Sequence, residues 1–264
     1  MGQKVTVLFL GDVIGQPGTR AVFTHVKQLS RKTAADLVII NGENAAEGFG
    51  LTPETVRTLF EAGATVITSG NHIWQRKEVY RLLDSEPRLL RPANYPPGAP
   101  GHGHCIVEIK GSRIAVVNLQ GRVRLVRTDC PFRKADDLLR ALEKDADLIF
   151  LDFHAEATEE KEALALYLDG RIAAQVGTHT HVPTRDARLL PKGTAYVTDV
   201  GSCGPSDSVI GFKPEISKRR VMTQLPLKNE VSETSATING VVVDLDAGTG
   251  LATSIRPIRE ESVL

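Results

Sequence analysis

The sequence predicts an α/β protein in which two packed β-sheets are covered by helices. Two observations predict this class. Short apolar runs alternate with segments of helical spacing through the first two thirds of the chain, and the last third carries mostly strand patterns. Continuous apolar strands joined by helices are typical of sheets whose faces are covered by helices. We find no repeat and no linker, so we expect one domain over residues 1–264.

The first 70 residues predict three strands with two helices between them. Strands are expected at Val5–Leu10, Leu37–Ile40 and Thr65–Thr68, and the first helix at Thr19–Leu29. The second helix has clear ends. Thr52 is a typical N-cap and Pro53 suits the first helical position, while Gly63 marks the end.

The middle of the chain begins with a loop, because Pro87–Gly103 contains five prolines and three glycines. A hairpin then follows, with strands at Ile106–Ile109 and Ile114–Leu119 on either side of a Lys-Gly turn. Further on, we expect helices at Pro131–Lys144 and Thr158–Leu168, strands at Leu148–Leu151 and Ile172–Val176, and then strands at Arg188–Leu190, Ala195–Val200 and Ala236–Leu245. We interpret Gly201–Pro205 as a turn.

The composition excludes several classes of protein. The chain has 32 basic and 32 acidic side chains, which argues against an extended surface for duplex nucleic acid or an anionic membrane. Three cysteines at unrelated spacings predict neither a disulfide framework nor a thiolate zinc site. With no signal peptide or membrane-spanning run, we expect a cytoplasmic protein, and a homo-oligomer is compatible with its size.

Metal-binding side chains recur where the predicted strands end. They are Asp12, Glu43, Asn44, Asn71, His72, His154, His179 and His181. The carboxyl ends of strands in α/β sheets hold ligand-binding loops, so we expect these side chains to converge. His179 and His181 are two apart in a segment we take as extended, which would point both imidazoles the same way. Asn71 and His72 are adjacent and should diverge.

Each of these residues also has an ordinary structural interpretation. A single Asp or Asn after a strand commonly caps a helix or forms a turn, and a single buried His is usually a hydrogen-bonded structural residue. We accept that interpretation for His25, His102 and His104. Five successive strand ends carrying such residues are not explained by capping, so the pattern predicts a metal site.

The ordered blocks resemble those of calcineurin-like metallophosphoesterases. The blocks are Gly11-Asp12, Gly42-Glu43-Asn44, Gly70-Asn71-His72, His154 and Gly177-Thr178-His179-Thr180-His181. Leu10–Gly15, Asn41–Asn44 and the segments Thr198–Gly201 and Ser208–Gly211 are similar to the YmdB-type subfamily. The resemblance implies a four-layer α/β/β/α sandwich, a two-metal centre and phosphodiesterase activity on 2′,3′-cyclic nucleotides.

The resemblance also implies a role for each residue. Asp12 and His181 would bind one metal, Asn44, Asn71, His154 and His179 the other, and Glu43 both, with His72 as the general acid. Two features depart from the broad superfamily but agree with the subfamily. Ile14 stands where a histidine ligand is usual, and the bridging carboxylate is Glu43 instead of Asp. The first metal would therefore have three protein ligands.

The donor set favours iron or manganese, with zinc as an alternative, because it contains oxygens and imidazoles but no thiolate. Two such ions can activate a water for attack on phosphorus. His72 would protonate the ribose 2′ oxygen as it leaves, giving a 3′-phosphate. We keep two alternatives open: a phosphomonoesterase acting on nucleotides or phosphoprotein, and a regulatory metal-binding or RNA-binding protein with weak catalysis.

Several other residues have a weaker claim to the site. Asn118, Gln120 and Arg122 end a strand and either reach a phosphate or lie in a solvated loop. The aromatic side chains at Phe49, Trp74 and Tyr95 follow strand ends and either stack on a base or pack internally. Cys203 is expected to be a small buried residue and not a nucleophile.

Overall fold

A computed structural model describes residues 2–262, and its strands form two sheets. The first sheet has the order β2 (Asp12–Val13), β11 (Ser202–Pro205), β12 (Ala236–Asp246), β1 (Lys4–Leu10), β3 (Leu37–Asn41) and β4 (Val66–Thr68), and β13 (Leu251–Ser262) also pairs with β12. The second has the order β5 (His104–Ile109), β6 (Ser112–Gln120), β7 (Leu148–His154), β8 (Ala174–Thr178), β10 (Ala195–Val197) and β9 (Arg188–Leu189).

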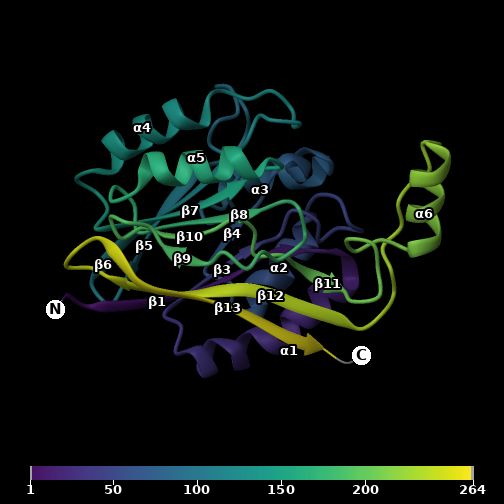
Figure 1. The fold of residues 1–264 in the computed structure, drawn as a ribbon, viewed down its shortest axis with the longest axis horizontal. Coiled ribbons are helices and arrows are strands. Elements are labelled where there is room, and N and C mark those ends of the chain that lie inside the picture. The colour runs from purple at the N-terminus through teal and green to yellow at the C-terminus, as the bar shows by residue number, and fades with distance from the viewer. Residues whose placement is uncertain (1, 263–264) are drawn as a thin grey trace.

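Helices cover the outer face of each sheet (Figure 1). The α-helices are α1 (Gly15–Thr33), α2 (Pro53–Ala62), α3 (Tyr80–Ser85), α4 (Pro131–Leu142), α5 (Thr158–Leu168) and α6 (Pro214–Thr223), and the 3-10 helices are η1 (Asn71–Trp74) and η2 (Lys77–Val79). The apolar residues of α1 and α2 pack on the first sheet, and those of α4 and α5 pack on the second.

Side-chain alternation along the strands builds the layers. On β1, Phe9 lies in the apolar layer between the two sheets, whereas Leu8 and Leu10 face the α1 and α2 side. On β7, Phe150 faces the other sheet and stacks on Phe9 with ring centroids 5.8 Å apart, whereas Phe153 faces the helices. Because each strand contributes to two cores, its run of apolar residues is continuous. The predicted four-layer α/β/β/α sandwich is confirmed.

The layer between the sheets becomes polar where the parallel strands end. Strands β1, β3 and β4 are mutually parallel, as are β6, β7, β8 and β10. At their carboxyl ends, Asn41, Thr68 and Thr178 all contact the buried carboxylate of Asp152. These contacts join the two sheets immediately beside the loops that carry the predicted metal ligands.

The predicted strands and helices from β1 to β10 are confirmed in their order, including the β5–β6 hairpin and the caps of α2 at Thr52 and Gly63, but the sequence pattern does not predict β2, η1, η2 or α3. The turn expected at Gly201–Pro205 is wrong. Residues Ser202–Pro205 form strand β11, which pairs with both β2 and β12 and so continues the sheet to its edge. The sequence pattern also does not predict strand β13.

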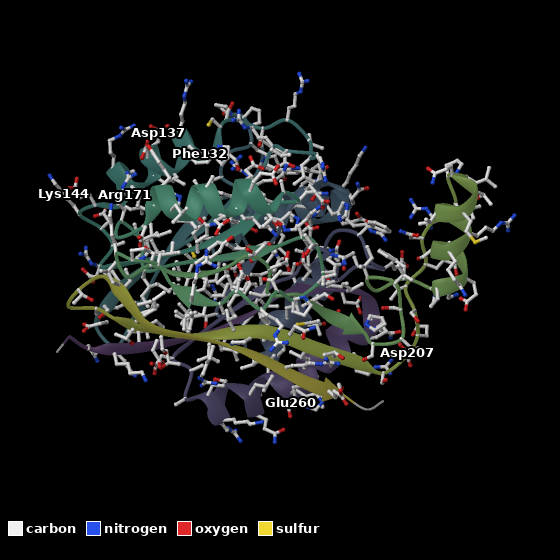
Figure 2. The ribbon with its side chains drawn as sticks, in the orientation of Figure 1. Phe132, Asp137, Lys144, Arg171, Asp207 and Glu260 are labelled. Carbon is white, nitrogen blue, oxygen red and sulfur yellow. The ribbon has the colours of Figure 1, made fainter. Side chains whose placement is uncertain are left out.

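The sequence does not predict helix α6 because this helix has almost no buried face. Ser217 is its one buried residue, and the helix stands apart from both sheets with side chains projecting around it (Figure 2). An apolar stripe is needed only where a helix packs on a core. Within residues 2–262, no helix combines the length and apolar character needed to cross a bilayer.

Candidate metal centre

All eight predicted site residues come from segments that follow strands of the two sheets, and they meet at one point. Asp12 lies on β2, directly after β1, and Glu43 and Asn44 follow β3. Asn71 and His72 open η1 after β4, His154 is the last residue of β7, and His179 and His181 follow β8. The convergence predicted from the strand ends is therefore present.

Two buried groups and one partly buried group form the centre of this cluster. One ligand atom each from Glu43, His154 and His179 lies within 4.8 Å of the others. The Nε2 atom of His154 lies 3.2 Å from Glu43 Oε2, 3.0 Å from His179 Nδ1 and 3.2 Å from Asn71 Oδ1. Four atoms that can each bind a metal thus surround one small space.

The remaining residues extend the cluster on either side. Asp12 accepts a hydrogen bond from the backbone N–H of His179 at 3.1 Å, and its other oxygen lies 3.8 Å from His154 Nδ1. His181 Nε2 is 3.1 Å from the Asn44 amide, whose oxygen is 2.8 Å from His72 Nδ1. Asn71 and His72 do diverge, as expected, because Asn71 contacts His154 and His72 contacts Asn44.

Two buried carboxylate oxygens favour a bound cation. Asp12 and Glu43 are both fully buried, and among the described residues Asp12 Oδ1 and Glu43 Oε1 have no hydrogen-bond partner. His72 Nδ1 lies 3.2 Å from Glu43 Oε1, but its hydrogen bond is with Asn44. An unpaired buried carboxylate oxygen costs several kcal/mol unless a cation or a donor satisfies it, so these two oxygens fit a metal site.

The outer nitrogens of the imidazoles are also arranged as metal ligands require. Each ring directs one nitrogen into the cluster and the other to a fixed partner, namely Thr178 Oγ1 for His154 at 2.9 Å, Glu156 for His179 at 3.2 Å and the Ile210 carbonyl for His181 at 2.9 Å. Such partners hold a metal-binding histidine in the correct tautomer and orientation. Behind His154, Thr178 donates to Asp152 at 2.8 Å.

The electrostatics of the cluster attract positive charge. Burial disfavours a charged His154, but the Glu43 and Asp12 carboxylates outweigh it and raise the pKa of His154 to about 9. Burial likewise opposes ionisation of Glu43, yet His154 and His72 hold the pKa of that carboxyl well below its usual range. Burial and the neighbouring charge of His154 lower the pKa of His179 to about 3, which favours a neutral His179 imidazole.

The cluster opens into a cleft of about 320 Å³. Its lining combines polar residues of the cluster with Gly48, Phe49, Ile210 and Phe212. Phe49 stacks on Phe212 with centroids 5.3 Å apart and meets the His72 ring edge-on at 5.1 Å. The cleft can therefore hold a small anion with an apolar group attached.

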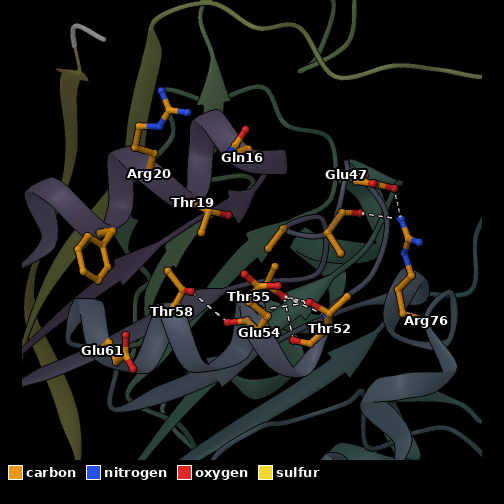
Figure 3. Close-up of a pocket in the computed structure, with 13 residues that line it drawn as sticks. Gln16, Thr19, Arg20, Glu47, Thr52, Glu54, Thr55, Thr58, Glu61 and Arg76 are labelled. Carbon is orange, nitrogen blue, oxygen red and sulfur yellow. Dashed lines mark hydrogen bonds and ion pairs between the residues drawn. The ribbon is translucent and has the colours of Figure 1, made fainter.

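A larger cavity of about 640 Å³ lies between α1 and α2 (Figure 3). Its wall includes Arg20, Glu47, Glu54 and Arg76, with Arg76 bound to Glu47 at 2.6 Å. None of the eight predicted site residues lines it. We place the chemistry in the smaller cleft, because only there do buried metal-binding atoms of the described residues converge.

Ile14 occupies its position by packing. Its side chain is fully buried, and a Cβ on Gly204 or Gly211 would come within 3.0 Å of Ile14 atoms. The two glycines therefore make room for the branched side chain at the position where the resemblance implies that a histidine is usual. Isoleucine has no atom that can bind a metal, so this position supplies no ligand. The Ile14 side chain instead fills the space beside Gly204 and Gly211.

The weaker candidates divide between the cleft and the core. Phe49 lines the cleft, whereas Trp74 and Tyr95 pack edge-on against each other at 5.1 Å. Asn118 and Gln120 are fully buried and satisfy Ser69, Asp152, Tyr95 and Val126, so they are structural and do not reach a ligand. Arg122 is exposed and its backbone N–H is held by Glu160.

Other predictions about single residues can be compared with the structure. Cys203 is fully buried, which confirms the expected buried residue, and burial raises the pKa of its thiol to about 12. The expectation of an extended segment at His179–His181 is wrong, since φ is 102° at His179 and 66° at His181. Both residues lie beyond the end of β8, so strand alternation does not set their directions.

Residues that the sequence pattern does not single out support the site. The sequence could have indicated Asp152, because this residue lies two positions before His154 and so on the same face of the strand. Glu156 and Phe212 had no such signal, since each reaches the cleft only through loop geometry, whereas Ile210 lies in the Ser208–Gly211 segment that resembles the YmdB-type subfamily.

The comparisons with known proteins agree with this architecture. Residues 8–258 match the model of the family described as YmdB-like protein. The chain is 50% identical to the 2′,3′-cyclic-nucleotide 2′-phosphodiesterase of Bacillus subtilis (strain 168), with 96% of each protein covered.

Two solved structures are also similar. A hypothetical protein from Thermus thermophilus has a TM-score of 0.92 and 45% identity, covering 98% of this chain and 100% of the other. The structure of a novel phosphatase from Mycoplasma pneumoniae has a TM-score of 0.94 and 39% identity, covering 100% and 95%. From the match over nearly its whole length and these similarities, the chain belongs to the YmdB-like family of hydrolases with the metallophosphoesterase fold.

Proposed function

We propose that this protein is a metal-dependent phosphodiesterase that hydrolyses 2′,3′-cyclic nucleotides to 3′-nucleotides. The observation that carries the proposal is the set of metal-binding atoms around His154, with two buried carboxylate oxygens left unpaired in a cluster that opens into a cleft. The substrate class is supported by the name of the Bacillus subtilis relative, a 2′,3′-cyclic-nucleotide 2′-phosphodiesterase.

We assign Asp12 and His181 to one divalent ion and Asn44, Asn71, His154 and His179 to a second, with Glu43 between them. When bound, such ions supply positive charge to the phosphate oxygens and acidify water. The donors are carboxylate, amide and imidazole groups without a thiolate, which favours iron or manganese and leaves zinc as the alternative. The localised charge also explains how a chain with no net charge binds a phosphate ester.

We assign His72 as the general acid. Its Nδ1 is held 2.8 Å from Asn44 Oδ1 and 3.2 Å from Glu43 Oε1, which leaves Nε2 to face the substrate. The side chain keeps 25% of its surface exposed and lines the cleft, so it can exchange a proton with solvent. As water adds to phosphorus, the bond from phosphorus to the 2′ oxygen breaks and that oxygen takes the His72 proton. The product has a 2′ hydroxyl and a 3′-phosphate.

The apolar wall suits the nucleoside part of the substrate. Phe49, Phe212 and Ile210 line the same cleft as His72, His179 and His181, within reach of a group attached to a bound phosphate. A ribose and base would cover these side chains, whereas inorganic phosphate would not. The wall therefore favours an organic phosphate ester as the substrate.

The test compares His72→Ala with His25→Ala. His25 is a histidine outside the cleft whose ring bonds Ser262, so its replacement controls for loss of an imidazole. We expect His72→Ala to lose about 10²–10⁴-fold in kcat on 2′,3′-cyclic AMP while its metal content stays at the wild-type level. His25→Ala should keep both. Unchanged turnover in His72→Ala would remove His72 from its assigned role.

The second candidate function is a phosphomonoesterase, because one structural relative is described as a phosphatase. Rates on 2′,3′-cyclic AMP and on its 3′-monophosphate product, measured with the same metal, separate the two. A higher kcat/KM on the monoester would overturn the diesterase proposal. Absence of turnover on either substrate, with nucleotide binding retained, would favour a regulatory role.

A further inference from the structure

A second buried carboxylate lies behind the His179–His181 segment, outside the proposed ligand set. Asp199 follows β10 and is fully buried. Its Oδ2 accepts a hydrogen bond from the backbone N–H of Thr180 at 3.0 Å, and its Oδ1 accepts one from Gly201 at 2.9 Å. Thr180 lies between the two histidines, so Asp199 holds the backbone from which both imidazoles extend.

Asp199 is paired with an equally buried cation. The Nζ of Lys161, from α5, lies 2.8 Å from Asp199 Oδ2, and neither side chain has any exposed surface. Removing two charges from water costs several kcal/mol per ion and is only partly repaid by their attraction. A buried ion pair is therefore weak evidence that Asp199 and Lys161 stabilise the fold. The contact of Asp199 with the backbone of Thr180 says more about the role of the pair.

The backbone beside Asp199 is strained. His179 has a φ of 102° and His181 a φ of 66°, and neither is a glycine. Such conformations cost about 1–3 kcal/mol each and persist only when surrounding contacts hold them. The N–H groups of His179 and Thr180 are held by carboxylates, Asp12 for the first and Asp199 for the second. These two bonds keep both imidazoles directed at the cluster.

We propose that Asp199 is a positioning residue for the metal centre, held in place by Lys161, whose Nζ binds the same carboxylate oxygen that accepts from the Thr180 N–H. The proposal rests on the ligand assignment made above, because its effect is transmitted through His179 and His181. Asp199 fixes Thr180, and the cation on Lys161 balances its charge.

The other hydrogen bonds of the Asp199 loop also hold its backbone in place. Thr184 donates through its hydroxyl to the backbone carbonyl of Asp199 at 3.1 Å and through its backbone N–H to the same carbonyl at 2.9 Å. The next N–H, of Val200, bonds the Gly177 carbonyl at 3.0 Å, which ties the Asp199 loop to the end of β8. Movement of Asp199 would therefore be transferred directly to the histidine segment.

The experiment removes the two charges together, so that neither is left buried and unpaired. Lys161→Met/Asp199→Asn keeps an amide oxygen as an acceptor for the Thr180 N–H. Lys161→Met/Asp199→Ala removes that acceptor. Each protein is stripped of metal, its fold is checked by circular dichroism and thermal melting, and its dissociation constant for Mn²⁺ is measured by calorimetry.

We expect the Asn variant to bind Mn²⁺ within about threefold of the wild type, and the Ala variant about 10–100-fold more weakly, the range found for residues that orient metal ligands. A purely structural role would lower the melting temperature of the Ala variant and leave its Mn²⁺ affinity unchanged, which would overturn the proposal. Equal loss in both variants would also overturn it, because the acceptor would then be irrelevant.

If the Ala variant does not fold, Asp199→Glu tests the positioning role instead. It keeps the charge pair with Lys161 but displaces the acceptor by one methylene, so weaker Mn²⁺ binding is expected, and wild-type binding would refute the positioning role. The failure of the proposed function looks different. In that case the wild-type protein itself would bind no Mn²⁺ in the cleft.

Discussion

Gly70 is the residue whose change should damage the metal centre most directly. It lies just before Asn71, and a Cβ at this position would come 2.1 Å from Glu43 Oε2 and 2.3 Å from His154 Nε2. Side-chain Cβ atoms are essentially never found closer than 3.0 Å to such atoms, so Glu43 would have to move by at least about 0.9 Å and His154, whose Cδ2 would lie 2.2 Å away, by about 0.8 Å. Metal-ligand distances tolerate only about 0.2 Å.

We therefore expect Gly70→Ala to weaken metal binding by at least about 100-fold, the upper end of what is seen when ligands are merely reoriented. Glu43 and His154 are fully buried, so neither can swing into solvent to make room. The overpacking should also lower the free energy of unfolding by about 1–3 kcal/mol. The assay is metal content by mass spectrometry after purification, with the dissociation constant for Mn²⁺ measured on the stripped protein.

The matched control is Gly98→Ala. A Cβ at Gly98 meets no atom within 4 Å, and the φ of 92° makes the cost purely one of backbone strain. That variant should lose about 1 kcal/mol of stability and keep its metal. Wild-type metal content and Mn²⁺ affinity in Gly70→Ala would refute the reasoning, because they would show that Glu43 and His154 do not bind the metal in the arrangement described.

Three further outcomes are expected. Chelation should lower the melting temperature by about 5–10 °C if the metal was present at about 100 times its dissociation constant. The melting temperature is measured by calorimetry, and no shift would contradict a cation bound at Asp12 and Glu43. Phe49→Ala should raise KM for 2′,3′-cyclic AMP about tenfold, since stacking on a base contributes about 1–3 kcal/mol. The KM for a cyclic phosphate without a base should stay unchanged, and an equal change for both substrates would exclude a contact between Phe49 and the base. Gln120→Ala should cost about 1–3 kcal/mol of stability in urea denaturation, because buried partners such as Tyr95 are left unpaired, while an altered KM would show that the side chain does reach the substrate.

The sequence predicts most of the fold because the strands that build it are buried on both faces. Such strands are short continuous apolar runs, and strands like β1 and β7 are separated by helices with clear caps or stripes. The elements that escape prediction lack these signals. Helix α6 has one buried residue and no stripe, and β11 contains a glycine and a proline because it lies toward the sheet edge beside β2.

The candidate site is predictable for a related reason. Parallel strands of one sheet end at one edge, so chemically capable residues after several strands must lie near each other, whatever the loops do. The same logic fails for His179 and His181, whose backbones depart from the strand. It also fails for Glu156 and for Lys161, which reach the site from a loop and from helix α5.

The sequence by itself thus determined which elements form and which side chains stand at the strand ends, because both depend on the local order of residues. Only the tertiary structure decided which atoms face one another. The pairing of Asp199 with Lys161 joins residues 38 apart, and the approach of Asn41 to Asp152 joins residues 111 apart. Contacts of this kind arise when the two sheets pack, and burial then makes each polar group depend on the partner it meets.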